Sequence, residues 1–345
     1  MRLDGDGADP AVTGRATMLH VASLARVSLK TVSRVVNDEG GVSPELADRV
    51  RDAVERLGYR QHLGASNLRR GRRTASIGVL VQDLSNDFCG DLLRAVETRA
   101  RDRGVVVISA SVDDEPERER ALVAGLVSRR CDGLILMPAS DDNSYLDAEV
   151  AAGLGVVLVD RGGESATLDS VTVDNRGGAA HACRHLLDQG HRRIACLVDD
   201  LGIPTASERR AGYRDAMALE GLSVREVGGI RTSADAQAAV AGLLRSDEPP
   251  TALFCGRNVI TIGAVRALRD ARMQRQVALV GFDDFSTADL LEPAITTIRQ
   301  DAAAEGAAAF DLLIERLDGH AGPRRALVLD TELITRGSGE IPGPG

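Results

Sequence analysis

From Thr74 onward, short apolar runs alternate with amphipathic stretches that have the spacing of helices. This alternation is typical of β-strands joined by helical crossovers, and such crossovers build parallel sheets. The predicted strands are 77–81, 105–109, 134–137, 156–160, 171–173, 194–197, 252–254 and 277–281, and the predicted helices are 89–103, 117–130, 177–189, 207–220, 234–244, 259–270 and 302–317. Because more than seven strands exceed one compact doubly wound sheet, the sequence predicts two α/β lobes with a ligand cleft between them.

A different pattern precedes this region, in residues 28–37. Val32, Val35 and Val36 have the i, i+3, i+4 spacing of one helical stripe, while the positions off the stripe carry Lys, Arg, Asn and hydroxyl side chains. No carboxylate lies between residues 28 and 37. This face suits a polyanion, so the stretch is predicted to be the recognition helix of a nucleic-acid-binding module.

Two further helices are predicted around it. The first begins after Thr17, and the third has Ser43 as its N-cap and Pro44 at its first position, with an apolar stripe that ends at Gly58. Two short helices joined by a tight turn form a helix-turn-helix, in which the second enters the major groove of DNA. The third helix would close a small core.

The charge of the chain is divided in the same way. The net charge of the 345 residues is −9, yet residues 15–73 contain twelve Lys or Arg against six Asp or Glu, a net charge of +6. The remainder therefore carries −15. A basic module joined to an acidic body favours nucleic acid as a partner of the module alone.

Several classes of protein are disfavoured by what the sequence lacks. It has no apolar run long enough to span a membrane and no signal peptide, so we expect a cytoplasmic protein without a membrane partner. The five cysteines have no metal or redox spacing, and no phosphate loop or nucleophile elbow appears, so we expect no metal, no cofactor, no catalytic residue and no enzyme activity. A transporter's solute-binding protein, the main alternative, would share the two lobes but not the basic headpiece.

The motifs of the chain resemble those of the lactose/galactose repressor (LacI/GalR) family of bacterial transcription regulators. They include TVSRVVN (31–37), VSPE (42–45), LGY (57–59), DGLI (132–135), GFDD (281–284) and TTIRQ (296–300). The resemblance implies a homodimer that reads a near-palindromic operator and a periplasmic-binding-protein-like body that binds a small effector, a sugar or sugar derivative. We expect a disordered leader (1–16), a headpiece (17–60), a hinge (61–73), the body (74–338) and a disordered Gly/Pro-rich tail (339–345) that lacks the heptads of tetrameric relatives.

The resemblance also assigns roles to residues that contact DNA. Leu29, Lys30 and Arg34 match base-reading positions, and Leu68 of the hinge matches a wedge inserted into the minor groove. The other matching positions, expected to contact phosphates or to support the hinge, are Thr17, Ser28, Thr31, Ser33, Asn37, Ser43, Tyr59 and Ala65. Taken singly, a Lys or Arg here could equally be part of a solvated helix face.

Positions that line the effector cleft in the family are occupied by Asp83, Asn86, Phe88, Asp160, Arg161, Arg209, Arg257 and Asp283. Any one of them could instead be a salt-bridge partner. Arg257 stands where relatives often carry Asn, which led us to expect that Arg209 and Arg257 together favour an anionic effector. Arg26 replaces the usual glycine of the headpiece turn, so a local difference is expected there. Effector binding would act by shifting the population of lobe arrangements.

Overall fold

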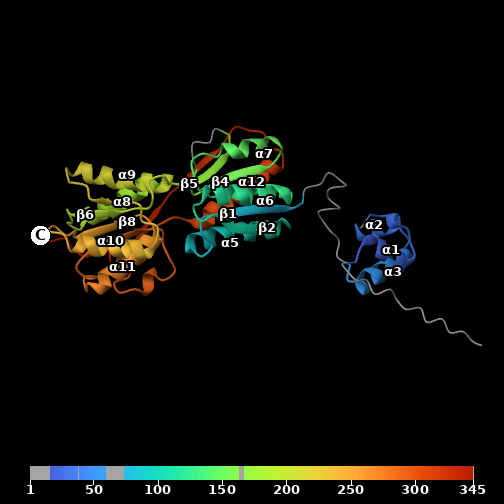
Figure 1. The fold of residues 1–345 in the computed structure, drawn as a ribbon, viewed down its shortest axis with the longest axis horizontal. Coiled ribbons are helices and arrows are strands. Elements are labelled where there is room, and N and C mark those ends of the chain that lie inside the picture. Colours follow the sequence, from blue (N-terminus) through green and yellow to red (C-terminus); the bar gives the residue numbers. More distant parts are fainter. Residues whose placement is uncertain (1–15, 38, 60–73, 163–166, 345) are drawn as a thin grey trace, which may run out of the picture. The chain divides into compact units, whose positions relative to one another are not determined.

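The computed structural model describes residues 16–37, 39–59, 74–162 and 167–344. The chain divides into two compact units, Met1–Thr74 and Ala75–Gly345, each of which is considered by itself (Figure 1). The predicted leader and hinge, with Ala65 and Leu68, lie almost entirely outside the described residues. Among the described residues, no helix is both long enough and apolar enough to cross a membrane.

The first unit, the headpiece, is the predicted three-helix bundle. Its helices are α1 (Met18–Ala25), α2 (Leu29–Val36) and α3 (Pro44–Arg56). Thr17, Ser28 and Ser43 act as N-caps, and each side chain accepts a backbone N–H of its helix. Val21, Val32 and Val50 are fully buried in the shared core, in agreement with the apolar stripes predicted for the second and third helices.

The turn between α1 and α2 keeps a left-handed conformation although it lacks glycine. Arg26 caps α1 with φ 49° and ψ 51°, in the region that favours glycine. From α3, Nη2 of Arg49 donates to the carbonyl oxygens of Ala25 (2.6 Å) and Arg26 (3.3 Å). The turn is therefore held in place by a side chain from the third helix.

We expect Arg26→Gly to stabilise the headpiece by about 1 kcal/mol, because glycine removes the left-handed strain while its freer unfolded chain offsets part of the gain. Hydrogen exchange of α1 and α2 amides in the full chain should slow by roughly fivefold. Arg26→Ala, which retains a Cβ, is the matched control and should not show this slowing. Faster exchange in the glycine variant would contradict the strain argument.

The N-lobe of the second unit is built on a six-stranded sheet of order β11-β5-β4-β3-β1-β2, with every pairing parallel. Its strands are β1 (Ser76–Val81), β2 (Val106–Ser111), β3 (Gly133–Leu136), β4 (Gly155–Val159), β5 (Asp169–Val173) and β11 (Ala326–Leu329). The helices α5 (Asp87–Asp102) and α12 (Ala302–Leu317) pack on one face, whereas α6 (Pro116–Ser128), η1 (Ser144–Leu146) and α7 (Asp147–Ala151) belong to the other.

The C-lobe has a second six-stranded sheet of order β12-β10-β9-β8-β6-β7, in which only β12 runs antiparallel among the described pairings. Its strands are β6 (Ile194–Leu197), β7 (Glu226–Val227), β8 (Ala252–Cys255), β9 (Ala278–Phe282), β10 (Thr296–Arg299) and β12 (Glu332–Ile334). Figure 1 shows α8 (Asn175–Asp188) and α9 (Pro204–Leu219) on one face, and α10 (Ser233–Leu244) and α11 (Asn258–Asp270) on the other. A short 3-10 turn, η2 (Ala288–Leu290), precedes β10.

The chain passes between the lobes three times: from β5 to α8, from β10 to α12, and from β11 to β12. Each lobe therefore contains segments that are far apart in the sequence. The two predicted α/β lobes are therefore confirmed, and the carboxyl ends of their parallel strands supply residues of the cavity between them that is described below.

The prediction of a disordered tail at 339–345 is wrong for residues 339–341. The Glu340 carboxylate accepts hydrogen bonds from Thr296 Oγ1 (2.8 Å) and the Gly337 N–H (2.6 Å). The carbonyl of Ile341 lies 2.9 Å from Nε2 of His191, a side chain with no exposed surface. Buried polar groups of the C-lobe need these partners, which fixes a segment whose composition alone suggested disorder.

Candidate DNA-binding surface and effector cleft

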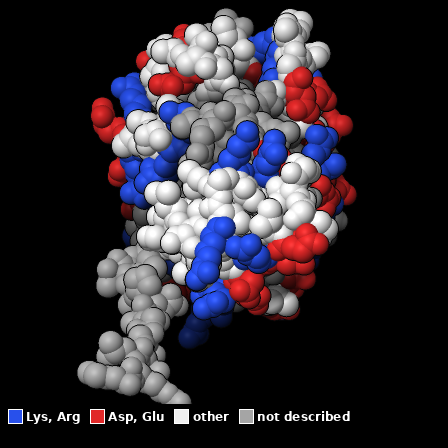
Figure 2. All heavy atoms as spheres, turned by 90° about the vertical axis from the view of Figure 1, so that its right-hand side faces the viewer, with Lys and Arg blue, Asp and Glu red and all other residues white. Residues whose placement is uncertain are grey.

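The first two residues of α2 are open to solvent, as recognition requires. Leu29 is 43% exposed and Lys30 is exposed, while Val32 faces the core with no exposed surface. In a helix-turn-helix, the N-terminal residues of the second helix contact base edges. Figure 2 shows Lys and Arg side chains exposed beside uncharged residues on the face turned to the viewer.

Arg34 lies one turn further along α2 and is half-buried. Its Nη1 is 3.6 Å from the position that a Cβ would take on Gly41, in the loop between α2 and α3. Gly41 has φ 91°, a conformation that side chains rarely adopt. This loop therefore leaves room for the guanidinium to lie against the headpiece surface.

The predicted phosphate contacts are mostly residues that also fix the ends of helices. Ser28 Oγ accepts the N–H of Thr31 (3.1 Å) and shares a 2.9 Å hydrogen bond with its hydroxyl. The Asn37 amide at the end of α2 donates to the carbonyl (2.5 Å) and hydroxyl (3.2 Å) of Ser33. Helix N-termini attract phosphate through their free N–H groups. The N-cap residues Thr17, Ser28 and Ser43 are exposed, so the N-termini of all three helices lie at the headpiece surface. Tyr59, by contrast, packs half-buried against the core.

Seven of the eight predicted effector residues line one cavity between the lobes, here called the neck. They are Asn86, Phe88, Asp160, Arg161, Arg209, Arg257 and Asp283. Asp83 is not brought to the neck, because its carboxylate accepts the N–H and hydroxyl of Ser85 (2.8 Å each) and closes a turn. The neck has a volume of about 40 Å³, whereas ligand sites usually measure about 300–1,000 Å³. The chain's own side chains therefore fill it.

Arg209 is the most heavily bonded cation of the neck. Its Nε donates to Asn175 Oδ1 (2.7 Å), and its Nη1 donates to the Gly256 carbonyl (2.8 Å) and lies 3.3 Å from Asp283 Oδ2. The guanidinium carbon stacks 3.8 Å from the centre of the Phe282 ring. Four partners from three segments of the chain thus fix this side chain.

The other two arginines are also paired with carboxylates of this chain. Arg161 Nη1 donates to Asp114 Oδ1 (2.5 Å), and its Nε lies 3.6 Å from Asp160 Oδ2. Arg257 forms an ion pair with Asp199. Since all three guanidinium groups of the neck already have carboxylate partners, the expectation of an anionic effector loses the basis that the sequence suggested.

Asp160 and Asp283 occupy equivalent places in the two lobes. Each follows a strand, β4 or β9, and each has a positive φ, 62° and 68° respectively. The N–H of Asp160 donates to Val171 in β5, and that of Asp283 donates to Ile298 in β10. Non-glycine residues in this conformation store strain of about 1–3 kcal/mol each, which is characteristic of functional sites.

Nine further residues that line the neck were not predicted from the sequence. They are Gln82, Cys89, Met137, Asp199, Ile203, Thr205, Ala206, Gly256 and Gln300. Asp199 could have been found, because it closely follows the strand at 194–197 and strand ends form the ligand site of such folds. Gln300 donates to Asp283 Oδ1 (2.5 Å), a contact that no spacing indicates.

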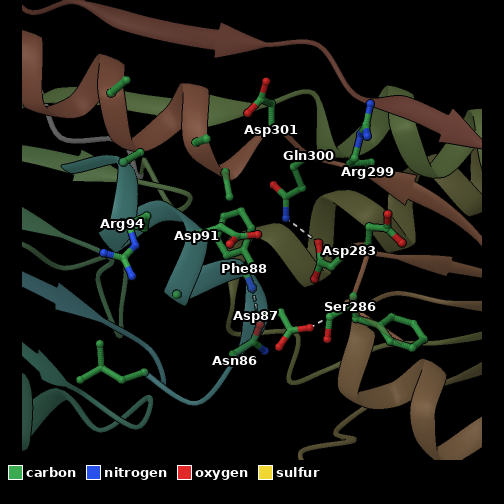
Figure 3. A pocket seen from close by; sticks show the side chains of 18 of the residues that line it. Asn86, Asp87, Phe88, Asp91, Arg94, Asp283, Ser286, Arg299, Gln300 and Asp301 are labelled. Carbon is green, nitrogen blue, oxygen red and sulfur yellow. Dashed lines mark hydrogen bonds between the residues drawn. The ribbon is translucent and has the colours of Figure 1, made fainter. Parts of the chain in front are cut away.

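Direct hydrogen bonds hold the lobes together beside the neck. The Asn86 and Asn258 side-chain amides exchange hydrogen bonds of 3.1 and 3.0 Å, and the Asp87 carboxylate accepts the N–H of Ser286 (2.7 Å). Figure 3 shows Asp87 and Ser286 meeting across a groove of about 1140 Å³ that shares Asn86, Phe88, Asp283 and Gln300 with the neck. A second groove of about 1110 Å³ shares Asp160, Arg161 and Thr205 with it.

Comparison with known proteins agrees with this architecture. Residues 17–61 match the family model "Bacterial regulatory proteins, lacI family", and residues 183–339 match the periplasmic binding protein-like domain. The chain is 30% identical to the ribose operon repressor of Haemophilus influenzae, over 94% of this chain and 98% of that protein. It is 29% identical to the transcriptional regulator DegA of Bacillus subtilis, over 94% and 98%.

Solved structures extend the comparison. The lac repressor dimer bound to operator and an anti-inducer is 26% identical, with a TM-score of 0.81 over 94% of this chain and 99% of that chain. The relatives are transcription regulators. The helix-turn-helix headpiece, the two parallel-sheet lobes and these matches together show that the chain belongs to the LacI family of bacterial transcription regulators.

Proposed function

We propose that the protein is a transcriptional repressor that binds a near-palindromic operator as a homodimer and responds to a small effector bound at the neck. The observation that carries this proposal is the exposed, carboxylate-free start of α2, where the Leu29 and Lys30 side chains are accessible for contacts with bases. Lys30 and Arg34 would donate to guanine, Leu29 would meet a thymine methyl, and the capped helix ends would hold phosphates.

A homodimer gives the operator its symmetry, as two headpieces then read two half-sites. β2 is an edge strand of the N-lobe sheet, and its apolar residues Val106 and Ile108 are 61% and 38% exposed. Exposed apolar side chains on a sheet edge favour a protein contact, so we assign this edge to the dimer interface. A monomer mass in sedimentation equilibrium at micromolar concentration would contradict the assignment.

The effector class that suits the neck is an uncharged polyol such as a sugar. Each guanidinium of the neck has a carboxylate partner, so a neutral ligand preserves the charge balance. Hydroxyl groups can accept from an arginine and donate to Asp160 or Asp283 in the same orientation. Thermal stabilisation of the body by glucose 6-phosphate but by neither glucose nor ribose would contradict this class.

The neck also suggests how the effector acts. Because the closed lobes leave about 40 Å³, a sugar enters only when the lobes move apart and the chain's own ion pairs rearrange. A ligand that favours one lobe arrangement shifts the population of the headpiece geometry coupled to it. We assign this transmission to the segment between the units, 61–73, and retain 17–60 and 74–338 as the bounds of headpiece and body.

We infer that the protein acts by binding rather than by catalysis and that it works in the cytoplasm, associated with the nucleoid when bound to DNA. Operator DNA is the partner that the headpiece suits, and a solute-binding protein of a transporter would have no use for this unit.

Selection of bound fragments from genomic DNA at physiological salt tests the proposal directly. We expect one near-palindromic sequence with two half-sites to be enriched. Binding that is equally strong on all fragments and disappears with added salt would reflect phosphate contacts alone and would refute sequence-specific repression.

A further inference from the structure

Asn175 forms hydrogen bonds on both sides of the passage from β5 to α8. It is the first residue of α8, is 1% exposed, and is separated by Asp174 from Val173, the last residue of β5. Its Nδ2 donates to the Val173 carbonyl (3.3 Å) in the N-lobe, and its Oδ1 accepts from Arg209 Nε (2.7 Å) in the C-lobe. One buried amide therefore bonds to both lobes at a point where the chain passes between them.

The chemistry of its partners fixes the orientation of this amide. Arginine has no acceptor and a backbone carbonyl has no donor, so the oxygen of Asn175 faces Arg209 and its nitrogen faces Val173. Because the two atoms belong to one rigid planar group, rotation of the amide changes both hydrogen bonds together. The position of the Arg209 guanidinium is therefore linked to the backbone that precedes α8.

Asp174 has the features of a pivot between the lobes. It is the N-cap of α8, and its backbone angles, φ −71° and ψ 77°, are those of neither a helix nor an extended strand. Asp301, in the passage from β10 to α12, is also an N-cap and has nearly the same angles, φ −88° and ψ 80°. Residues at the ends of elements commonly absorb the dihedral changes of domain motion. The bond from Asn175 to Val173 spans such a residue, so rotation about Asp174 strains or breaks it.

Arg209 lines the neck, whereas Asn175 lines the second groove instead. A ligand that enters the neck therefore contacts the guanidinium directly and acts on Asn175 through it. The carboxylate paired with Arg209 is attached in a similar way, because Asp283 Oδ1 accepts from Gln300 Nε2 (2.5 Å), and Gln300 immediately precedes Asp301. Both members of the ion pair are thus bonded to a residue next to a pivot.

We propose that Asn175 is a positioning residue that transmits the position of the Arg209 guanidinium to the pivot at Asp174: its two bonds hold the lobes closed, and displacement of the guanidinium frees the pivot. The proposal rests on the proposed function only in taking the effector as the agent that displaces Arg209. The link itself requires neither DNA nor effector. One hydrogen bond contributes roughly 2- to 10-fold to an equilibrium, which is the size of the effect expected.

The test measures the separation of the lobes in the full chain without ligand. Fluorophores at Glu117→Cys and Glu220→Cys, exposed positions in opposite lobes, report the distance by energy transfer in single molecules, and the native cysteines are buried. We expect the ratio of open to closed molecules to rise roughly 2- to 10-fold in Asn175→Leu, which lacks both bonds. Arg176→Ala, the matched control, removes a surface ion pair with Asp215 (2.6 Å) and should leave the ratio unchanged.

Arg209→Lys distinguishes a link from two separate effects. Lysine keeps the positive charge but places a methylene group where Nε donates to Asn175. It should open the lobes by a similar factor, because the amide is then no longer oriented. The double variant with Asn175→Leu should open them no further, since both changes interrupt the same path. Factors that multiply in the double variant would show that the two residues act independently and would overturn the proposal.

Asn175→Asp keeps the test decisive if leucine disturbs the fold. Its carboxylate still accepts from Arg209 but has no donor for the Val173 carbonyl, so the lobes should open while Arg209 stays in place. The Nε–H signal of Arg209 in ¹⁵N NMR, assigned by its loss in Arg209→Lys, reports that position. Its exchange with water should stay slow in Asn175→Asp and become roughly tenfold faster in Asn175→Leu.

A purely structural asparagine predicts a different result. Both variants would then unfold at lower urea, but their folded molecules would keep the wild-type ratio of open to closed lobes. An unchanged ratio in Asn175→Asp overturns the proposal whatever the operator and effector experiments show.

Discussion

Arg209→Ala is expected to destabilise the body by about 3–5 kcal/mol, because it leaves the buried Asp283 carboxylate without its cation. The same change removes the partner of Asn175 and of the Gly256 carbonyl and empties the face of the Phe282 ring. Urea unfolding of the full chain, followed by far-UV circular dichroism, measures the loss. We expect the transition of the body to move to lower urea with little change in slope.

Arg210→Ala is the matched control for this prediction. Arg210 is the next residue of α9, but its guanidinium lies nearer the surface and pairs with Glu226 at 3.0 Å. Partly exposed ion pairs contribute about 0–1 kcal/mol, so the control should cost far less. Equal losses in the two variants would show that the neck arginine has no special role in joining the segments around it.

Arg34→Ala is expected to weaken operator binding by about 1–3 kcal/mol, which corresponds to roughly 5- to 150-fold, and to relax the preference at one base position. The reason is that a guanidinium reads guanine through two donors, and alanine restores neither. Affinities for operators in which each base is changed in turn measure both effects at fixed salt.

Arg51→Ala provides the comparison, because this exposed residue of α3 is already paired with Asp48 at 2.5 Å. It should alter binding slightly and equally on all operators. If Arg34→Ala also weakened every operator by the same factor, Arg34 would be a phosphate contact, and Leu29 and Lys30 would remain the only base-reading candidates on α2.

The headpiece could be predicted almost residue by residue because its signals are local. Ser43 with Pro44 marks the start of α3 within one turn of chain, and Gly58 marks its end. Two of the missed strands depart from the expected pattern in different ways. In β10, Thr296 and Thr297 are polar yet completely buried, so this strand lacks the apolar run that predicts an internal strand. In β11 the run ALVL is apolar, but the strand is largely exposed at the edge of the sheet.

For the cleft, most of the predicted lining residues were correct, but the hydrogen bonds and ion pairs among them could not be predicted. Resemblance to the family identified seven residues of the neck, but their pairing depends on segments far apart in the chain, as between Asn86 and Asn258. Pairing is what removed the argument for an anionic effector. Burial of the Glu305 side chain in α12 gave no signal either, because one carboxyl group inside the predicted helix 302–317 has the appearance of an ordinary solvent-facing residue.

The three passages of the chain between the lobes have a consequence for the gene. The last segment, from β11 to β12, supplies an edge strand to each sheet within a few residues. A frameshift or early stop codon ahead of Ala326 therefore damages both lobes together, and no cut in the sequence yields two halves that each encode a whole lobe. Recombination can exchange the headpiece of such a regulator as a separate cassette, but it can exchange the body only as a whole.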